Sequence, residues 1–484
     1  KYMEERLQLL RERHSEDIAR ADVADSLYKL STVLHARDNR DQAKTYYCKA
    51  LTMWTELYGE DTADERIAET LQALGRLLRS QKDLEGARKY LVKARNMLFK
   101  IHGDGAPRVQ TAAVFNELGV VFKAQDKLEL AARYHWAALS IQRQLYGQDT
   151  PHSEVATTIH HLGVVFKAQG NLSSAEECYK TSLKEKKQVF GENTPHAKVA
   201  ATLSRVGGVL HARGELDKAK DYYVKALNMK EKVYGRRAAH IKIAATLQRL
   251  GSVTQDQRNL VEAEKYLLQA LSIYEKKKQP HKKEVERGKA LALSRMGALL
   301  HAQGKWEEAE ACFHQALELQ QRIFKEKPAH KEIAGTRARL GDLFQDRGDL
   351  QAAREQYGHA LGMYKKLFHD RPYPDFARCL YQFGKLQKQL RDIHGAKTSF
   401  SASVEMMHKT LGGPRSSCSR AHSLVQRASA ETSELDKATA TERAILLLLL
   451  LCVGGGVVGV DIQKALLRVW VWWACGFGGA GSGC

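Results

Sequence analysis

The chain has 484 residues, of which 43% are hydrophobic and 27% are charged. These fractions exclude an intrinsically disordered chain, and the length is sufficient for several domains. The formal net charge of +20 predicts acidic partners, which are protein surfaces, peptides, anionic lipids or nucleic acids. The alternative is that the Lys and Arg side chains only solvate exposed helix faces.

The eight cysteines are scattered along the chain, and no two of them form a CxxC pair. The sequence therefore predicts neither a disulfide framework nor a zinc site. We expect a reducing, cytoplasmic environment for the protein.

Residues 1–14 carry Met3, Leu7 and Leu10 at helical spacing. We expect this segment to be the end of a helix whose first part is missing. The chain begins with Lys1 rather than Met, so we expect it to be cut from a longer protein.

The next segment, residues 15–411, repeats itself with a period near 44 residues. A glycine returns after steps of 44 and later of 46, 44 and 43 residues, and an alanine keeps the same period in the second half of each unit. A fixed period of 20–50 residues is typical of a solenoid. The glycines are Gly75, Gly119, Gly163, Gly207, Gly251, Gly297, Gly341 and Gly384, and the alanines are Ala43, Ala87, Ala131, Ala175, Ala219, Ala263, Ala309, Ala353 and Ala396.

Each unit has the pattern of a helical hairpin, as residues 150–191 illustrate. Val155, Ile159 and Leu162 lie on one helical stripe, and a second amphipathic run follows a break at Gly170. Thr150-Pro151 is predicted to cap and start the first helix. One hairpin cannot bury both of its faces, so the sequence predicts an all-α stack of about nine helix-turn-helix repeats.

The repeated motifs Leu/Val-Gly, Ala-x-x-Tyr-Tyr and Ala-Leu resemble the tetratricopeptide repeat. The tether between units, LYGQDTPH in one case, is similar to the longer repeat of kinesin light chain and nephrocystin. The resemblance covers residues 17–411 and implies a right-handed α-solenoid that binds other proteins. The implied partners are kinesin heavy chain and microtubules for a cargo adaptor, or ciliary complexes for a nephrocystin-like scaffold.

The composition changes after residue 411. Residues 412–443 are rich in Ser, Thr, Ala, Arg and Glu, and we predict a flexible linker with some helical potential from Ser423 onward. Residues 444–484 open with an uncharged apolar run of 17 residues and continue with many Gly and Trp. A transmembrane helix needs about 20 apolar residues, so three interpretations stay open: an anomalous sequence, a membrane anchor through 445–460, or a buried cap helix.

The sequence contains no motif that carries enzyme chemistry, because the P-loop, HExxH, EF-hand and GxSxG patterns are all missing. His160 and His161 are adjacent, so their rings point about 100° apart on a helix and do not readily share a metal ion. Other histidines return in the tether before each first helix, which indicates a structural role; they are His152, His196, His240, His281 and His330. We predict no catalysis, no cofactor and no metal site.

The strongest functional signal lies on the first helix of each unit. The slots two residues before and four after each glycine flank the side opposite the core, which a solenoid turns toward its concave surface, and Glu117 is the only acid among these eighteen slots. We predict a groove for an extended acidic segment, because the planar Arg guanidinium binds carboxylates in a bidentate manner. The predicted groove residues are Lys123, His161, Lys167, Arg205, His211, Arg249, Arg295, His301 and Arg339.

Two observations bear on how such a groove would read its ligand. The resemblance implies an Asn pair that grips the peptide backbone, but of this pair only Asn116 remains, and Ser204-Arg205 and similar pairs replace it. This replacement favours recognition of charge by side chains. The alternative is that the basic residues pair with acids of adjoining helices, where exposed pairs contribute little.

The leading hypothesis is therefore a non-enzymatic scaffold that binds acidic protein or peptide segments. A nucleic-acid-binding solenoid is the second class, against which the basic columns lack interleaved aromatic residues for base stacking. A membrane-anchored scaffold is the third class and depends only on residues 445–460.

Overall fold

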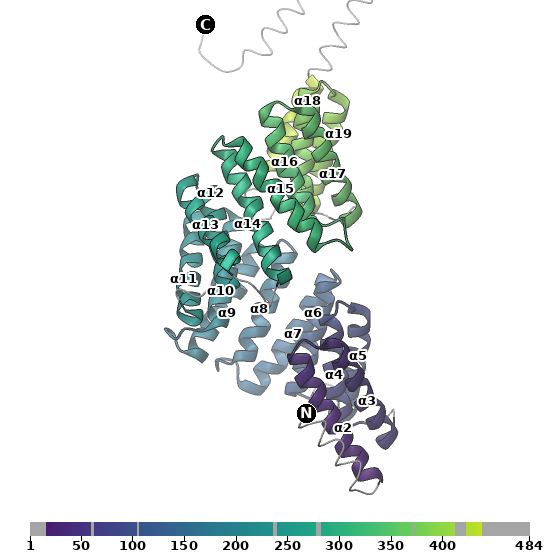
Figure 1. Ribbon diagram of the computed structural model, residues 1–484. Coiled ribbons are helices and arrows are strands. Elements are labelled where there is room, and N and C mark those ends of the chain that lie inside the picture. Colours follow the sequence, from purple (N-terminus) through teal and green to yellow (C-terminus); the bar gives the residue numbers. More distant parts are fainter. Residues whose placement is uncertain are drawn as a thin grey trace, which may run out of the picture.

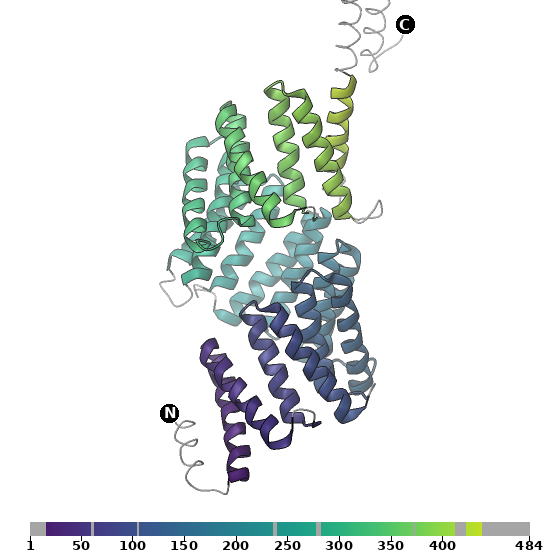
Figure 2. The same ribbon diagram turned by 90° about the vertical axis from the view of Figure 1, so that its right-hand side faces the viewer.

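The computed structural model describes residues 16–59, 62–103, 106–235, 240–276, 282–369, 371, 373–411 and 423–437. Within these ranges the chain is all-α, and helices α2 to α19 form nine pairs that follow one another along an open, curved superhelix (Figures 1 and 2). This arrangement confirms the all-α repeat architecture predicted from the period. The segments 1–14 and 444–484, for which a preceding helix and an apolar tail were predicted, lie outside the described residues. So do residues 412–422 and 438–443 of the predicted linker, and His281 of the predicted tether series.

Each pair consists of a first helix and a second helix that are joined by a short turn. The first helices are α2 (Glu16–Ala36), α4 (Glu65–Ser80), α6 (Val109–Ala124), α8 (Ser153–Ala168), α10 (Ala197–Arg213), α12 (Ile241–Asp256), α14 (Lys282–Ala302), α16 (Lys331–Arg347) and α18 (Pro374–Gln389). The second helices are α3 (Arg40–Tyr58), α5 (Leu84–His102), α7 (Leu128–Tyr146), α9 (Leu172–Phe190), α11 (Leu216–Tyr234), α13 (Leu260–Lys276), α15 (Trp306–Ile323), α17 (Leu350–Phe368) and α19 (Ile393–Leu411).

The repeated glycine is explained by the close approach of the two helices within a pair. A Cβ placed on Gly163 would lie 2.9 Å from a ring carbon of Tyr179 on the second helix, and one on Gly207 would lie 3.0 Å from Tyr223. Real Cβ atoms do not approach so closely, so the glycine makes room for a large side chain of the partner helix. The other periodic glycines face a ring or a leucine in the same way; the partners are Leu91, His135, Leu267, Phe313, Tyr357 and Phe400.

The repeated alanine lies on the second helix of each pair, where that helix packs against the first. Ala43, Ala175 and Ala309, like the other alanines of the series, are fully buried at the start of their second helices. Small side chains in these slots let the two helices pack closely, and the large side chains between them fill the interior. The core is therefore a chain of local clusters that follows the stack from α2 to α19.

The recurring histidine of the tether has a defined structural role. His196 is the N-cap of α10, where its Nδ1 accepts a hydrogen bond of 3.2 Å from the backbone N–H of Lys198, and its ring stacks on Phe190 at the end of α9 with 3.7 Å between centroids. The same cap and stack occur at the starts of α8, α12 and α16. The prediction that Thr150-Pro151 caps and starts α8 is therefore wrong, because His152 takes the cap and α8 begins at Ser153.

Residues 423–437 differ from the flexible linker predicted for 412–443, because they form a helix that packs on the last pair. Leu435 is buried against Ala396 and Phe400 of α19, and Lys388 of α18 forms ion pairs with Glu431 and Glu434 at 2.8 and 3.0 Å. This helix covers the apolar end of the stack that α18 and α19 would otherwise expose. Among the helices that the structure describes, none is both long and apolar enough to cross a membrane.

Candidate functional site

The first helices line the inner wall of the superhelix. First helices of successive pairs contact one another directly, as α12 does with α14 and α14 with α16, which places them on the shorter, concave side of the curve. The arginines predicted to form the groove lie on four of these helices: Arg205 on α10, Arg249 on α12, Arg295 on α14 and Arg339 on α16. They are thus placed in a single column along consecutive repeats.

Arg295 and Arg339 connect neighbouring first helices through hydrogen bonds to uncharged groups. Arg295 Nη1 donates to the carbonyl oxygen of Gln248 at 2.8 Å, and Arg339 Nη1 donates to Ser294 Oγ at 2.9 Å. Burial, followed by the charges of Arg339 and Arg249, lowers the pKa of Arg295 to about 10. A guanidinium with this pKa keeps its charge at pH 7, so the column stays cationic.

The amount of negative charge near these four arginines differs along the column. In the described part of the chain, no carboxylate lies within ion-pair distance of Arg205, Arg249, Arg295 or Arg339. Asp342 pairs with Arg378 at 3.4 Å and, with Asp375, affects the pKa of Arg339. The α16–α18 end therefore contains nearby negative charge, whereas the positive charge on α8–α12 is less compensated.

The predicted groove residues four positions after each glycine include side chains that form ion pairs and side chains that do not. His211 Nε2 lies 2.6 Å from an Asp256 oxygen, and His301 Nε2 lies 3.0 Å from an Asp346 oxygen on the next first helix. These two histidines therefore contact acids of adjoining helices, which was the alternative to a ligand-binding role. Lys123 is exposed on α6 and has no ion pair with any described residue.

Lys167 and His161 lie deeper in the wall than an exposed ligand-binding side chain would. Lys167 Nζ donates to the carbonyl oxygen of Gly208 on α10 at 3.1 Å, and burial together with Arg205 and Arg249 lowers its pKa to about 8. The His161 ring lies 5.2 Å from that of His135, and burial, followed by Lys186, lowers its pKa to about 4. His161 is therefore neutral at pH 7 and adds no charge to the groove.

Two lysines that belong to this charged region were missed in the sequence. Lys186 on α9 and Lys230 on α11 are only 4% and 6% exposed, and both extend from second helices toward the first-helix wall. A signal for Lys186 was present, because it follows Ala175, Tyr179 and Ser182 on the core stripe of its helix. A lysine on a core stripe is unusual, since Lys is almost never fully buried without a partner.

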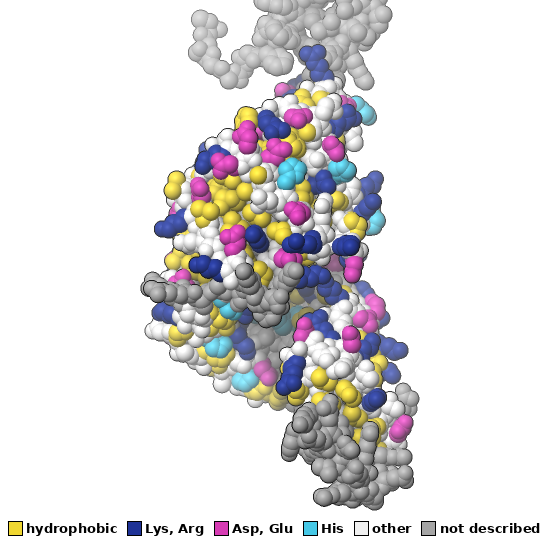
Figure 3. Space-filling model, in the orientation of Figure 1, with side chains coloured by type: hydrophobic (Ala, Val, Ile, Leu, Met, Phe, Trp, Pro, Cys, Tyr) yellow, Lys and Arg dark blue, Asp and Glu magenta, His cyan; other side chains and the backbone are white. Residues whose placement is uncertain are grey.

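One face of the molecule carries charges of both signs. In the face shown in Figure 3, basic and acidic side chains are mixed, beside apolar areas.

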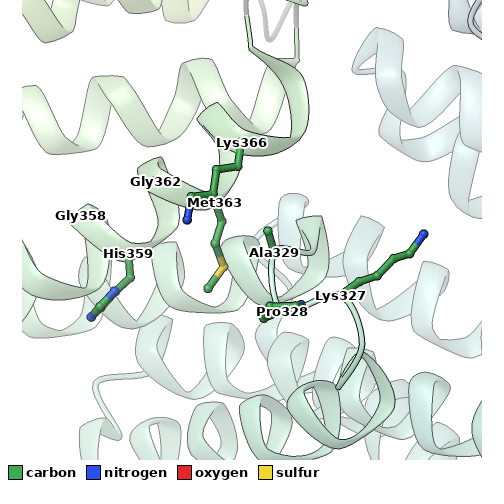
Figure 4. A pocket seen from close by; sticks show the side chains of 8 residues that line it. All are labelled: Lys327, Pro328, Ala329, Gly358, His359, Gly362, Met363 and Lys366. Atoms are coloured by element: carbon green, nitrogen blue, oxygen red, sulfur yellow. The ribbon is translucent and has the colours of Figure 1, made fainter.

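A separate pocket of about 540 Å³ lies between α17 and the loop of residues 327–329, with Gly358, Gly362 and Met363 along one side (Figure 4). It is built on a second helix and is not part of the inner wall, and the described residues contain no His, Cys, Asp and Glu cluster that could hold a metal ion.

Comparison with known families decides which group of proteins this is. The tetratricopeptide repeat family matches residues 22–98, 110–188, 198–276 and 289–366, which together make up more than half of the chain. The chain belongs to the tetratricopeptide repeat family. No curated protein sequence is significantly similar to it.

Several solved structures resemble this chain at low sequence identity. The apo form of the quorum sensor NprR from B. thuringiensis is 15% identical, with a TM-score of 0.54 over 74% of this chain and 91% of that one. A Rap protein complexed with competence and sporulation factor is 14% identical, with a TM-score of 0.51 over 81% of this chain and 99% of that one. Putative kinesin light chain repeats from Podospora anserina are 17% identical, with a TM-score of 0.39 over 46% of this chain and the whole of that one.

Proposed function

We propose that this tetratricopeptide repeat protein is a non-enzymatic scaffold that binds extended acidic segments of other proteins along the inner wall of α8–α16. The observation that carries the proposal is the column of Arg205, Arg249, Arg295 and Arg339, which has no ion-paired carboxylate among the described residues. Unpaired cations on a concave wall attract anionic ligands more strongly than scattered surface charges do. Carboxylates of a partner would supply the missing negative charge.

The dimensions of the wall suit a peptide in an extended conformation. Packed helices lie about 8–10 Å apart, so four consecutive first helices span roughly 27 Å. An extended chain advances about 3.3 Å per residue, so about eight or nine residues would follow the whole column. The Rap structure of similar fold contains a bound factor, which is in keeping with ligand binding by such a superhelix.

Two more specific roles follow from the similarity of the repeat to that of kinesin light chain and nephrocystin. The first is a cytoplasmic cargo adaptor with kinesin heavy chain and microtubules as partners, and the second is a scaffold for ciliary complexes. Purification of the full chain from cells would separate them by the partner that remains bound.

The proposal is tested by charge reversal on the inner wall. A fluorescent twelve-residue peptide of alternating Glu and Gly should bind the wild-type chain, and R205E/R249E should weaken binding by about 100-fold or more, because two attractive contacts become repulsive. Fluorescence anisotropy measures the affinity, and circular dichroism checks that the variant is folded.

The matched control is R133E/R354E, which changes the net charge equally on the exposed faces of α7 and α17. This control should bind the peptide as the wild type does. Equal binding by R205E/R249E and the wild type would overturn the proposal. So would a twelve-nucleotide RNA that binds more tightly than the peptide and loses affinity more steeply with salt.

A further inference from the structure

The lysines of α9 and α11 lie at the floor of the inner wall, where second helices reach the junctions between first helices. Lys230 Nζ donates to Ser204 Oγ on α10 at 3.1 Å and also to Thr246 Oγ1 on α12. Lys186 Nζ donates to Thr202 Oγ1 on α10 at 2.8 Å. Hydroxyl groups thus orient both ammonium groups, but they contribute no negative charge.

Three further cations lie near these floor lysines, and one of them, Arg205, acts on the pKa of His160 together with Lys186. The charges of Arg249 and Arg205 act on Lys230, and Lys167 is affected by the same two arginines. We use the name lysine seat for the group Lys167, Lys186, Arg205, Lys230 and Arg249. The five side chains come from α8, α9, α10, α11 and α12, so the seat is a feature of the folded stack and not of one helix.

The seat has no internal counter-ion in the described part of the chain. The charged side chains that face it are themselves basic: Lys198 and Lys242 on the first helices, with the titratable His160 and His161 on α8. The phenols Tyr179, Tyr223 and Tyr274 also lie near its arginines, and burial raises the pKa of each, so they are neutral at pH 7. Glu185, which precedes Lys186 in the sequence, is engaged by Arg143 of α7. Burying cations without a counter-ion is unfavourable, so an anionic ligand would relieve a cost that the fold already bears.

The fold itself does not require lysine in this slot. The slot of Lys186 and Lys230 is held by Gln142 in the preceding repeat, whose Oε1 accepts from Thr158 Oγ1 at 2.7 Å. It is held by Gln320 in a later repeat, whose Nε2 donates to Thr336 Oγ1 at 3.0 Å. Because glutamine makes the same inter-helix contact without a charge, the two lysines are not explained by packing alone.

We propose that the lysine seat binds the phosphoryl group of a phosphorylated serine or threonine within the acidic segment. This inference rests on the proposed function and makes it more specific. A phosphoryl group carries a charge of about −1.5 to −2 and three strong acceptor oxygens. A carboxylate carries a single charge and would leave most of the seat uncompensated.

The hydrogen-bonding capacity of the seat agrees with this ligand. An ammonium group has three donors, of which Lys186 uses one and Lys230 uses two on the hydroxyl groups. Each lysine therefore keeps at least one donor for an acceptor oxygen. The guanidinium groups of Arg205 and Arg249 add the paired donors that match phosphate oxygens.

The protonation of the floor lysines provides an independent signature. Burial lowers the pKa of Lys186 to about 8 and the pKa of Lys230 to about 7, with Arg249 and Lys242 contributing to the latter. Both groups bind a proton more tightly when a dianion is present. Affinity for a phosphopeptide should therefore fall as the pH rises from 7 to 9, and binding at pH 8 should take up protons.

The experiment uses the full chain and three fluorescent twelve-residue peptides that share a Glu-Gly sequence and differ at one central position, which is phosphoserine, Glu or Ser. The phosphoserine peptide should bind at least tenfold more tightly than the Glu peptide. In K186Q/K230Q this preference should disappear, with a loss of about 150-fold or more for the phosphoserine peptide, the size expected when two charge-assisted contacts are removed. Glutamine is chosen because the fold already holds it in the same slot.

The control K184Q/K232Q removes two exposed lysines from the same two helices and should keep the phosphoserine preference. Equal binding of the phosphoserine and Glu peptides, or an unchanged preference in K186Q/K230Q, would overturn the phosphoryl site. If the Glu peptide still binds and still depends on Arg205 and Arg249, the acidic groove survives that result. If none of the three peptides binds, the proposed function itself fails.

Discussion

Single residues set the distance between the two helices of each pair. Gly163 faces the ring of Tyr179, which is fully buried and cannot move away. The neighbouring pairs use the same contact with a ring or a leucine. The periodic glycine is therefore required by packing against the second helix, and not by backbone conformation.

Gly163→Ala should lower the free energy of unfolding by about 1–3 kcal/mol, because the new methyl group would overpack the seam. Gly362→Ala on α17 is the control, since a Cβ there meets no atom within 4 Å. The control should be neutral or stabilising by up to about 1 kcal/mol, the helix propensity difference between Gly and Ala. Chemical denaturation measures both variants, and equal stability would contradict the packing account.

Buried histidines give a second prediction at this scale. Burial, together with His161, lowers the pKa of His135 to about 3. Burial, together with Lys186 and His161, lowers the pKa of His160 to about 3 as well. The unfolded chain takes up these protons near pH 6.5, whereas the folded chain resists them, so stability falls as the pH drops from about 6.5 toward 3. At pH 5 His135 alone should lower the free energy of unfolding by roughly 2 kcal/mol.

His135→Tyr removes this titration and places in the slot the side chain that Tyr179 provides one repeat later. The decrease in Tm between pH 7 and pH 5 should be smaller for this variant than for the wild type. Substituting the exposed His359 by Gln should leave the decrease unchanged. If His135→Tyr and the wild type lose the same Tm on acidification, the buried-histidine explanation is wrong.

At the scale of elements, the helix of residues 423–437 closes the end of the stack. Its Leu435 is 3% exposed and packs on Phe400 and Ala396 of α19. Repeat arrays need a terminal cap because the last pair has no neighbour to cover its apolar face. This helix fills that role within the described chain.

Leu435→Asp should detach the cap helix, because an ionised carboxylate would replace an apolar side chain in the core at a cost of about 3–5 kcal/mol. Hydrogen exchange should then increase in α18 and α19 while α8–α12 stay protected. Ser433→Asp, on the exposed side of the same helix, is the control. Unchanged exchange in α18 and α19 would show that residues 423–437 do not stabilise the last pair.

The elements were largely predictable from the sequence, because the glycine and alanine slots are local features that repeat. The start of α8 was not, since the His152 cap depends on a ring stack with Tyr146 of the preceding helix. Helical potential from Ser423 onward was predicted, but the packing of this helix on α18 and α19 was not, because residues 412–443 have a polar composition and only Ala428 and Leu435 of the helix are fully buried.

The candidate site was predicted in part. The column of arginines follows from helical geometry and the period, and the structure places it along consecutive first helices. The pairing of His211 with Asp256 depends on contacts between repeats, which the pattern of one helix does not contain. Lys186 and Lys230 were missed because they reach the wall from second helices, whereas the groove was predicted from the first helices alone.

At the scale of the whole molecule, the stack distributes its charge unevenly. Acids and bases are mixed on the face shown in Figure 3, and pairs such as Arg347–Glu310 lie between second and first helices. Along α8–α12 the inner wall instead collects cations that face other cations. The central claim is that this wall receives a negatively charged segment of a partner.

Site-specific crosslinking tests this claim most directly. A Glu-Gly peptide carrying a central photoreactive phenylalanine is irradiated with the full chain at low salt, and the crosslinked residues are identified by mass spectrometry. We expect crosslinks on the first helices α8, α10, α12 and α14, and their loss when unlabelled peptide competes. Crosslinks confined to the second helices, or to the pocket beside Met363 and Gly362 in Figure 4, would contradict the account.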